Sequence, residues 1–343
     1  MIRRLLFVPI LSLALTVAGG GVALACGGLV APGHAEVLQK ATTLVVWHGG
    51  FEHYITGFQF AGSANSFGYI IPLPGNPTKI QKGGDWTLER LEREVNPVPQ
   101  FAGAAAVSAP AASARVVVLQ QTKVGALGIT VVRGGGPDVA AWAKRNGFDL
   151  TPDAPKVLAA YSQQGAVFAL AKFDRASAAK QGLIQGQGEV IQFTIPAKAP
   201  WVPLRILALG KGAPELVDAD VFVLTDQRPA FAPAIGAIQG MTVLRNEWAN
   251  QQLLTDLRSD QRMSWFPATG MWFTALRLHT TAQTITYDLS INGGGPAGGV
   301  PFGQRIPVGL PWAWWLGAGL LVVLVARTAK APSYRAHAST RLS

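Results

Sequence analysis

Three side chains around one predicted turn have the residue types of a metal site. His48 precedes the pair Gly49-Gly50, and Glu52 and His53 follow it. Two imidazoles and a carboxylate are a ligand set that zinc uses in hydrolytic enzymes. The spacing is one residue longer than the inverted zincin motif, and two glycines disfavour a helix that would present both histidines on one face. On a hairpin the side chains can still face each other, so a metal site and a pair of partly exposed strand-end histidines both stay open.

Other catalytic patterns are weak. Ser63 and Ser66 lack the Gly-x-Ser-x-Gly context of a nucleophile elbow. The run 134–136 is three glycines without the Lys and the Ser or Thr of a P-loop, and it indicates a turn. Triads form in space, so the chain alone does not exclude one. The pattern favours a protein that is not an enzyme, and we expect no cofactor.

The chain begins with a pattern typical of a secretory signal. Arg3 and Arg4 precede an apolar run, and a stretch of small residues ends at Ala25. We therefore expect residues 1–25 to be a signal peptide that is cleaved before Cys26. The alternative is an uncleaved anchor, but the apolar run is shorter than the ~20 residues that span a bilayer.

Cys26 is the single cysteine and would be the first residue of the mature protein. Its position is either an accident of the cleavage site or a site of lipid attachment. Ala23 and Leu24 reverse the large-then-small order that a bacterial lipoprotein signal prefers before its cysteine. A lone cysteine forms no disulfide within the chain, so the exported domain, 26–292, must be stabilised by an apolar core.

The C-terminal part has the pattern of a membrane anchor. Residues 306–326 carry no charge, and at about 1.5 Å per residue they reach roughly 31 Å, enough for one transmembrane helix. Trp312, Trp314 and Trp315 lie where indole rings favour the membrane–water boundary. The tail, 327–343, is basic without an acidic residue, so the positive-inside rule places it in the cytoplasm.

The glycine-rich segment 293–305 then serves as a stalk between the exported domain and the membrane. This topology makes the protein a single-pass protein of the cell membrane, with its N-terminal domain outside the cytoplasm. The formal net charge is +10, and the two arginines of the leader and four basic residues of the tail leave about +4 for the exported part. Such a mild excess argues against a dedicated nucleic-acid surface, so we expect no nucleic-acid partner.

Within the exported part, strands outnumber helices. Asp85 is a predicted helix cap, and Pro97 ends that helix. The glycines that follow two further helices, Gly147 and Gly165, are typical of the left-handed C-terminal position. We predict helices at 138–146, 153–164 and 246–258, and strands at 42–48, 52–60, 67–73, 115–120, 126–133, 166–173, 189–195, 204–210, 221–225, 271–279 and 284–291. This order predicts an α+β or mainly β domain with a few short helices, plus one C-terminal transmembrane helix.

Several stretches of the chain resemble one bacterial family. They are Cys26-Gly27-Gly28, Glu52-His53-Tyr54, the strand from Phe67 to Pro74, Pro203-Leu204-Arg205, and the run from Val221 to Arg228. Together they are similar to the exported family known as domain of unknown function 2330, over most of the chain from Cys26 to about Ile291. The resemblance implies export and supplies no activity, substrate or catalytic residue.

Two functional hypotheses follow from these patterns. In the first, the protein is a membrane-anchored binding or scaffolding module of the bacterial cell envelope, with an envelope protein as its partner. In the second, it is a metal-dependent envelope hydrolase that uses His48, Glu52 and His53. The tether and the β-rich body favour the first hypothesis.

Overall fold

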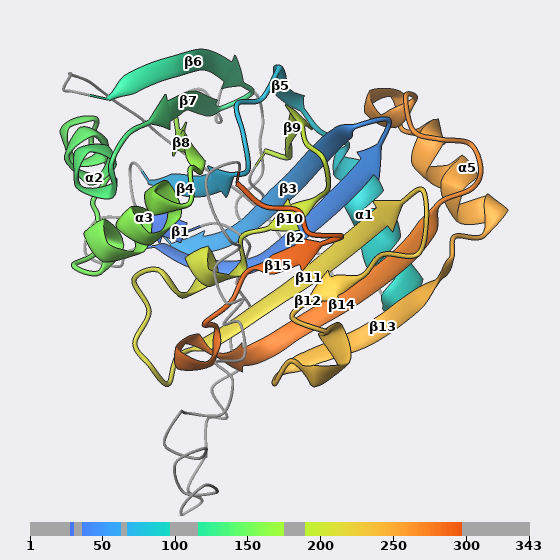
Figure 1. The fold of residues 1–343 in the computed structure, drawn as a ribbon. Helices are drawn as coiled ribbons and strands as arrows, with labels where there is room; N and C mark the ends of the chain where they lie inside the picture. The colour runs from blue at the N-terminus through green and yellow to red at the C-terminus, as the bar shows by residue number, and fades with distance from the viewer. Residues whose placement is uncertain (1–27, 31–35, 63–66, 97–115, 175–188, 297–343) are drawn as a thin grey trace, which may run out of the picture. The chain divides into compact units, whose positions relative to one another are not determined.

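Two β-sheets pack face to face in the computed structural model of the chain (Figure 1). The structure describes residues 28–30, 36–62, 67–96, 116–174 and 189–296. The predicted signal peptide, Cys26, most of the stalk and the predicted span 306–326 lie outside these ranges. No helix within them is long and apolar enough to cross a membrane.

The larger sheet has seven strands and holds the β2–β3 hairpin near its centre. In order across the sheet, its strands are β13 (Met241–Trp248), β14 (Trp272–Thr281), β11 (Leu216–Thr225), β2 (Glu36–His48), β3 (Phe51–Gly62), β9 (Ile191–Pro196) and β5 (Lys79–Lys82). Neighbouring strands are antiparallel except β11 and β2, which are parallel.

The second sheet has five antiparallel strands. In order, they are β1 (Gly28–Val30), β4 (Gly68–Leu73), β8 (Val167–Phe173), β7 (Leu127–Arg133) and β6 (Val117–Val124). β1 pairs only with Gly68–Ile70 of β4, so Pro72 lies beyond it and faces no partner on that side. A proline has no N–H to donate, so it fits a position that lacks a partner strand on one side.

A small third sheet joins the C-terminal end of the described chain to the two larger sheets. It consists of β10 (Trp201–Val202), β15 (Leu289–Ile291) and β12 (Phe231–Ala232). Its residues Val202, Leu289 and Ile291 belong to the same apolar core as the facing sheets. All described residues therefore form one unit.

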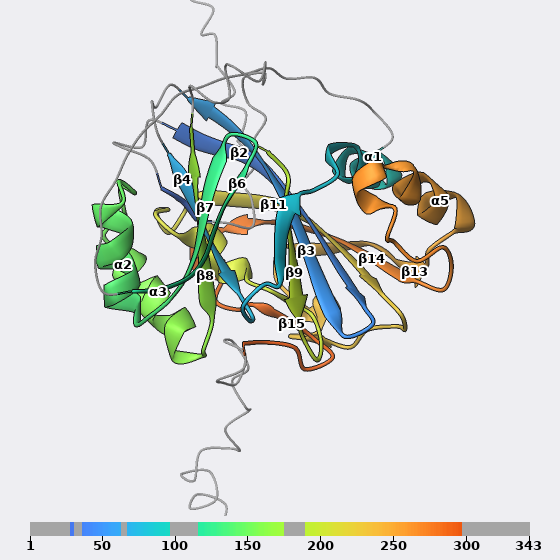
Figure 2. The same ribbon diagram turned by 90° about the horizontal axis from the view of Figure 1, so that it is seen from above.

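Four α-helices of the described ranges cover the two outer faces, as Figure 2 shows. The apolar residues of α1 (Asp85–Val95) and α5 (Gln251–Ser259) pack on the seven-stranded sheet. Those of α2 (Gly136–Arg145) and α3 (Ala154–Gln163) pack on the five-stranded sheet. The arrangement is a mixed α+β domain in four layers, which agrees with the α+β class predicted from the sequence.

Local signals placed most helices correctly, but not every cap. Gly147 and Gly165 follow α2 and α3 with φ of 76° and 84°, as predicted. The predicted cap Asp85 is instead the first residue of α1. The cap comes from a distant residue, because Asp260 Oδ2 accepts hydrogen bonds from the backbone N–H and the hydroxyl of Thr87, at 3.3 and 2.9 Å.

Three predicted elements are wrong in part. Residues Leu204–Ala208 form the 3-10 helix η2 instead of a strand, and the N–H of Arg205 is satisfied by the carboxylate of Asp288 at 2.9 Å. The predicted helix at 246–258 begins only at Gln251, since the residues before it pair with β14. Only Leu289–Ile291 of the predicted strand 284–291 is extended in a sheet.

Candidate functional site at the hairpin end

The β2–β3 turn defines one end of the seven-stranded sheet. Gly49 and Gly50 have φ of 58° and 82°, which is the backbone that a two-residue hairpin turn requires. The turn sets His48 opposite Phe51 and Trp47 opposite Glu52. We use the name hairpin end for this end of the sheet, which comprises Trp47–His53, Thr225–Arg228, Asn246–Trp248, Trp265 and Trp272.

The hairpin separates the three residues of the predicted metal site. Successive residues of a strand point to opposite faces, so Glu52 and His53 of β3 lie on different sides of the sheet. His48 is exposed, and its Nδ1 lies 2.6 Å from Oδ1 of Asp226. No group of three His, Cys, Asp or Glu side chains in the described ranges is placed to hold a metal ion. The three residues therefore do not form a common ligand set in this geometry.

His53 is a packing residue on the face covered by α1 and α5. Its ring stacks on Trp265 with the ring centroids 3.9 Å apart. Its Nδ1 lies 3.3 Å from the hydroxyl of Thr194 and 3.4 Å from Nε2 of Gln192. Burial, and next the nearby His48, lower the pKa of His53 to about 4, so its imidazole is neutral at neutral pH.

Glu52 lies on the opposite face, fully buried between the sheets. Its Oε2 accepts a hydrogen bond from the backbone N–H of Trp201 at 3.1 Å, which joins β3 to β10. Burial raises the pKa of Glu52 well above its ordinary value, although the Trp201 hydrogen bond lowers it. The buried carboxyl of Glu52 therefore connects the third sheet to the hairpin.

A second buried acid, Asp288, attaches the third sheet to α3 and η2. Asp288 precedes β15, and its Oδ1 accepts hydrogen bonds from the hydroxyl of Tyr161 at 2.8 Å and from the N–H of Arg205 at 2.9 Å. Burial raises the pKa of Asp288 to about 7, against the smaller lowering effects of these hydrogen bonds and of the Arg205 charge. The third sheet is thus attached through two buried carboxyl groups.

A row of tryptophans crosses the hairpin end. Strand register sets Trp248 of β13 opposite Trp272 of β14. Trp272 also pairs with Thr225 of β11. On its other side, Thr225 pairs with Trp47 of β2. Residues directly opposite each other share a face, so these side chains lie on the same side of the sheet as Glu52. The row extends from the β2–β3 hairpin to the edge strand β13.

The outer part of this row is exposed and ordered by aromatic contacts. Trp248 is 57% exposed, and its ring meets that of Trp272 edge to face with the centroids 5.3 Å apart. The guanidinium of Arg228 lies 5.4 Å from the Trp272 ring centroid, within the range of a cation–π contact. The indole N–H of Trp272 donates to Oδ1 of Asn246 at 2.8 Å.

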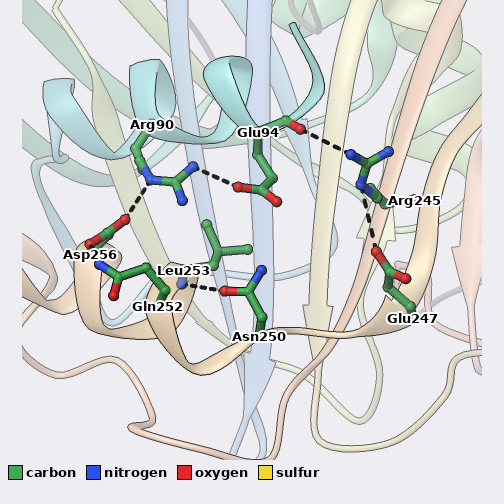
Figure 3. Close-up of polar contacts among 8 residues, drawn as sticks. All are labelled: Arg90, Glu94, Arg245, Glu247, Asn250, Gln252, Leu253 and Asp256. Atoms are coloured by element: carbon green, nitrogen blue, oxygen red, sulfur yellow. Dashed lines mark hydrogen bonds and ion pairs between the residues drawn. The ribbon is translucent and has the colours of Figure 1, made fainter. Parts of the chain in front are cut away.

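The backbone around Trp248 is fixed by polar contacts to both covering helices, which Figure 3 shows. Two residues after it, Asn250 caps α5 by accepting the N–H of Leu253 at 2.7 Å. Three residues before it, Arg245 donates to the backbone oxygen of Glu94 at the end of α1, at 3.4 Å. The exposed indole thus projects from a braced edge strand.

The two helices are also joined to each other. Nε of Arg90 lies 2.7 Å from Oδ2 of Asp256 on α5, and its Nη1 lies 2.8 Å from Oε2 of Glu94 (Figure 3). These groups are between 17% and 23% exposed, so water screens their attraction less than at an open surface. The contacts of Arg90 therefore fix α1 and α5 relative to each other, and these two helices hold the backbone on both sides of Trp248.

The tryptophan row was not predicted from the sequence. Trp248 fell inside a predicted helix, and Trp272 and Arg228 are distant from it along the chain. One local signal was available. Asn250 is a typical N-cap residue, and a helix that starts after it leaves Trp248 outside the helix. The row itself depends on the strand order, which no local pattern encodes. Cys26, the candidate for lipidation, lies outside the described residues.

Comparisons with known proteins identify a family without a known activity. A family model described as an uncharacterized protein conserved in bacteria, DUF2330, matches residues 21–292. No curated protein matches the chain. Among solved structures, the crystal structure of baculovirus P35 aligns with 77% of this chain and 99% of that chain, at 9% identity and a TM-score of 0.43. A likeness of that size carries no argument about this protein.

Proposed function

This chain belongs to DUF2330, an uncharacterized protein family conserved in bacteria, and we propose that it is an extracytoplasmic binding module of the cell envelope. In this proposal, the domain is exported by the leader, 1–25, and is held at the membrane by the span at 306–326. The tail at 327–343 remains in the cytoplasm. The support for this topology is the residue pattern: a basic start with an apolar run, an uncharged stretch behind tryptophans, and a basic end.

The observation that carries the proposal is the tryptophan row. Tryptophan and arginine are enriched among the residues that contribute most of the binding energy at protein interfaces, and an indole buries much surface with only two rotatable bonds. Trp248 is 57% exposed at the outer end of the row, and the guanidinium of the exposed Arg228 lies 5.4 Å from the centroid of the neighbouring Trp272 ring. These groups have the composition of an interaction surface, and the partner we propose is another protein of the envelope.

The bracing of β13 favours recognition further. A partner that binds a mobile segment must offset the conformational entropy that the segment loses. Trp248 instead lies between the capped helix α5 and the Arg245–Glu94 contact, so little ordering remains to be done. Binding at the hairpin end therefore costs little conformational entropy, so more of the free energy of apolar contact contributes to affinity.

Crosslinking in intact cells tests this proposal. We expect the wild-type protein to capture one or more envelope proteins reproducibly, and Trp248→Ala to lose them. The matched control is Val118→Ala, which removes an apolar side chain that is 43% exposed on β6, in the other sheet. Capture that is equal in the two variants contradicts the hairpin end as the recognition surface, and capture of nothing by wild type contradicts a protein-binding module.

A further inference from the structure

A groove of about 450 Å³ lies on the outer face of the five-stranded sheet, at the C-terminal end of α2. The strands contribute Gly128, Thr130 and Lys172 to its lining, and α2 with the turn after it contributes Trp142 and Phe148. Its volume falls within the range of small-molecule sites, which is about 300–1,000 Å³. The groove is separate from the hairpin end, which belongs to the other sheet.

Gly128, the second residue of β7, leaves space over the sheet, and no local feature of the backbone requires a glycine there. Its φ is not in the left-handed region, and it pairs with Lys123 in a regular part of the β6–β7 ladder. Among the described atoms, a Cβ added at Gly128 would meet only the backbone oxygen of Lys172, at 4.0 Å. Glycine weakens a strand, and where neither a bulge nor tight packing requires it, it marks a place where a ligand approaches the backbone.

Lys172 brings a positive charge to this space. Its ammonium donates to the backbone oxygen of Asn146 at 2.9 Å, and burial lowers the pKa of Lys172. In the part of the chain that the structure describes, no carboxylate forms an ion pair with Lys172; the nearby Asp174 is placed 3.9 Å from Lys123. An ammonium uses three donors, so two remain for a ligand.

Gly147 allows the lysine to take this position. A Cβ at Gly147 would lie 2.5 Å from Nζ of Lys172, so any other residue would displace the ammonium. The positive φ of Gly147, 76°, also ends α2 at this point. The same residue therefore ends the helix and admits the charge to the groove.

We propose that this groove binds a small organic carboxylate, with the carboxylate at Nζ of Lys172 and the remainder of the molecule over Gly128. The charge of Lys172 selects the anion, since a carboxylate gains charge-assisted hydrogen bonds there. The hydroxyl of Thr130 and the amides of Gln121 and Asn146 line the same groove and can bind further polar atoms. This inference does not depend on the proposed role of the hairpin end.

Isothermal titration calorimetry on the purified full chain tests the proposal with two pairs of probes. The carboxylates are N-acetylleucine and glucuronate, and their uncharged counterparts are N-acetylleucinamide and glucose. We expect saturable binding of at least one carboxylate and at least about tenfold weaker binding of its counterpart, which corresponds to one charge-assisted contact.

Three variants locate the site. Lys172→Met should weaken binding of the carboxylate at least about tenfold, and Gly128→Val should weaken it by filling the groove while leaving the charge in place. Lys144→Met is the matched control, because Lys144 is an exposed lysine of α2, the helix beside the groove, and does not line the groove. It should leave the dissociation constant within about twofold.

The proposal is overturned if neither carboxylate binds saturably, if the uncharged counterparts bind as well, or if Lys144→Met weakens binding as much as Lys172→Met. Circular dichroism establishes that each variant is folded. Where Lys172→Met does not fold, Gly128→Val and Lys172→Arg decide the matter, since the arginine variant retains the charge and should retain binding.

Discussion

The α1–α5 face of the seven-stranded sheet and the α2–α3 face of the five-stranded sheet each bury an apolar cluster beneath two helices. They differ in the partner of a partly buried cation. On the first, Arg277 makes two hydrogen bonds to Asp220, at 2.7 and 2.8 Å, which raise the pKa of Arg277. On the second, Lys172 has a backbone carbonyl for a partner, and burial lowers its pKa. The charge of Arg277 is neutralised by Asp220, whereas Lys172 donates only to a carbonyl and can still bind an anionic ligand.

The titratable groups of the two faces also respond to pH in opposite ways. His53 contacts the α1–α5 layer through Trp265, and its pKa is lowered to about 4. Asp288 contacts α3 through Tyr161, and its pKa is raised to about 7. Both groups are neutral in the folded protein between these values, so within this range the first face loses stability as the pH falls and the second loses stability as the pH rises.

The largest expected effect tests whether the two apolar clusters are equally well packed. Leu257 of α5 and Leu158 of α3 are both fully buried. Truncation to alanine removes apolar contacts and leaves a cavity, so Leu257→Ala and Leu158→Ala should each lower the free energy of unfolding by about 3 kcal/mol. Urea denaturation measures both, and a loss below about 1 kcal/mol at Leu158 would show that the α2–α3 face is loosely packed.

A smaller effect should separate the two cations. Asp220→Asn leaves Arg277 without its charged partner, and we expect a loss of about 2 kcal/mol in the free energy of unfolding. Lys172→Met removes a half-exposed charge that has no such partner, and the loss should stay below about 1 kcal/mol. If the two variants lose the same free energy of unfolding in urea denaturation, the carboxylate partner does not distinguish Arg277 from Lys172.

The pH response of the α2–α3 face should follow Asp288. Because its folded pKa is raised from 3.8 to about 7, its contribution to stability is complete below pH 4 and is lost as the pH rises toward 7. We expect amide hydrogen exchange to show weaker protection of α3 and β15 at pH 7.5 than at pH 5. Exchange rates corrected for the intrinsic effect of pH measure this, and Asp288→Asn should remove most of the difference.

The smallest effect is expected at His53, which is only partly buried. Its folded pKa is lowered from 6.5 to about 4, so its contribution is complete above pH 6.5 and is lost as the pH falls toward 4. Protection of α5 should therefore decrease between pH 6.5 and pH 4. His53→Phe keeps the stack on Trp265 without a titrating group, and an unchanged decrease in this variant would assign the effect elsewhere.

Local patterns predicted much of the fold because they act over a few residues. The Gly49-Gly50 turn and the glycine that ends α2 each follow from a backbone conformation with positive φ, which few residues other than glycine adopt. The errors arise where distant segments decide. Asp260 caps α1 in place of Asp85, and pairing with β14 holds the residues before Gln251 in a strand.

The candidate sites divide in the same way. The period of two along β3 already places Glu52 and His53 on opposite faces, so their separation was readable from the hairpin prediction. The tryptophan row was not, because its members come from β2, β13 and β14. The groove likewise depends on how α2 lies over the sheet, although a glycine at 128 within a strand pattern was a signal for it.

The parallel pairing of β11 with β2 has a consequence for how the chain reaches this fold. His48 and Asp226, at one end of that pair, are 178 residues apart in sequence. During synthesis the hairpin emerges long before β11, so one edge of β2 has no neighbour throughout that interval. Unpaired strand edges promote association between chains, and contacts between distant residues form slowly. The free edge of β2 is therefore exposed to association with other chains until β11 pairs with it.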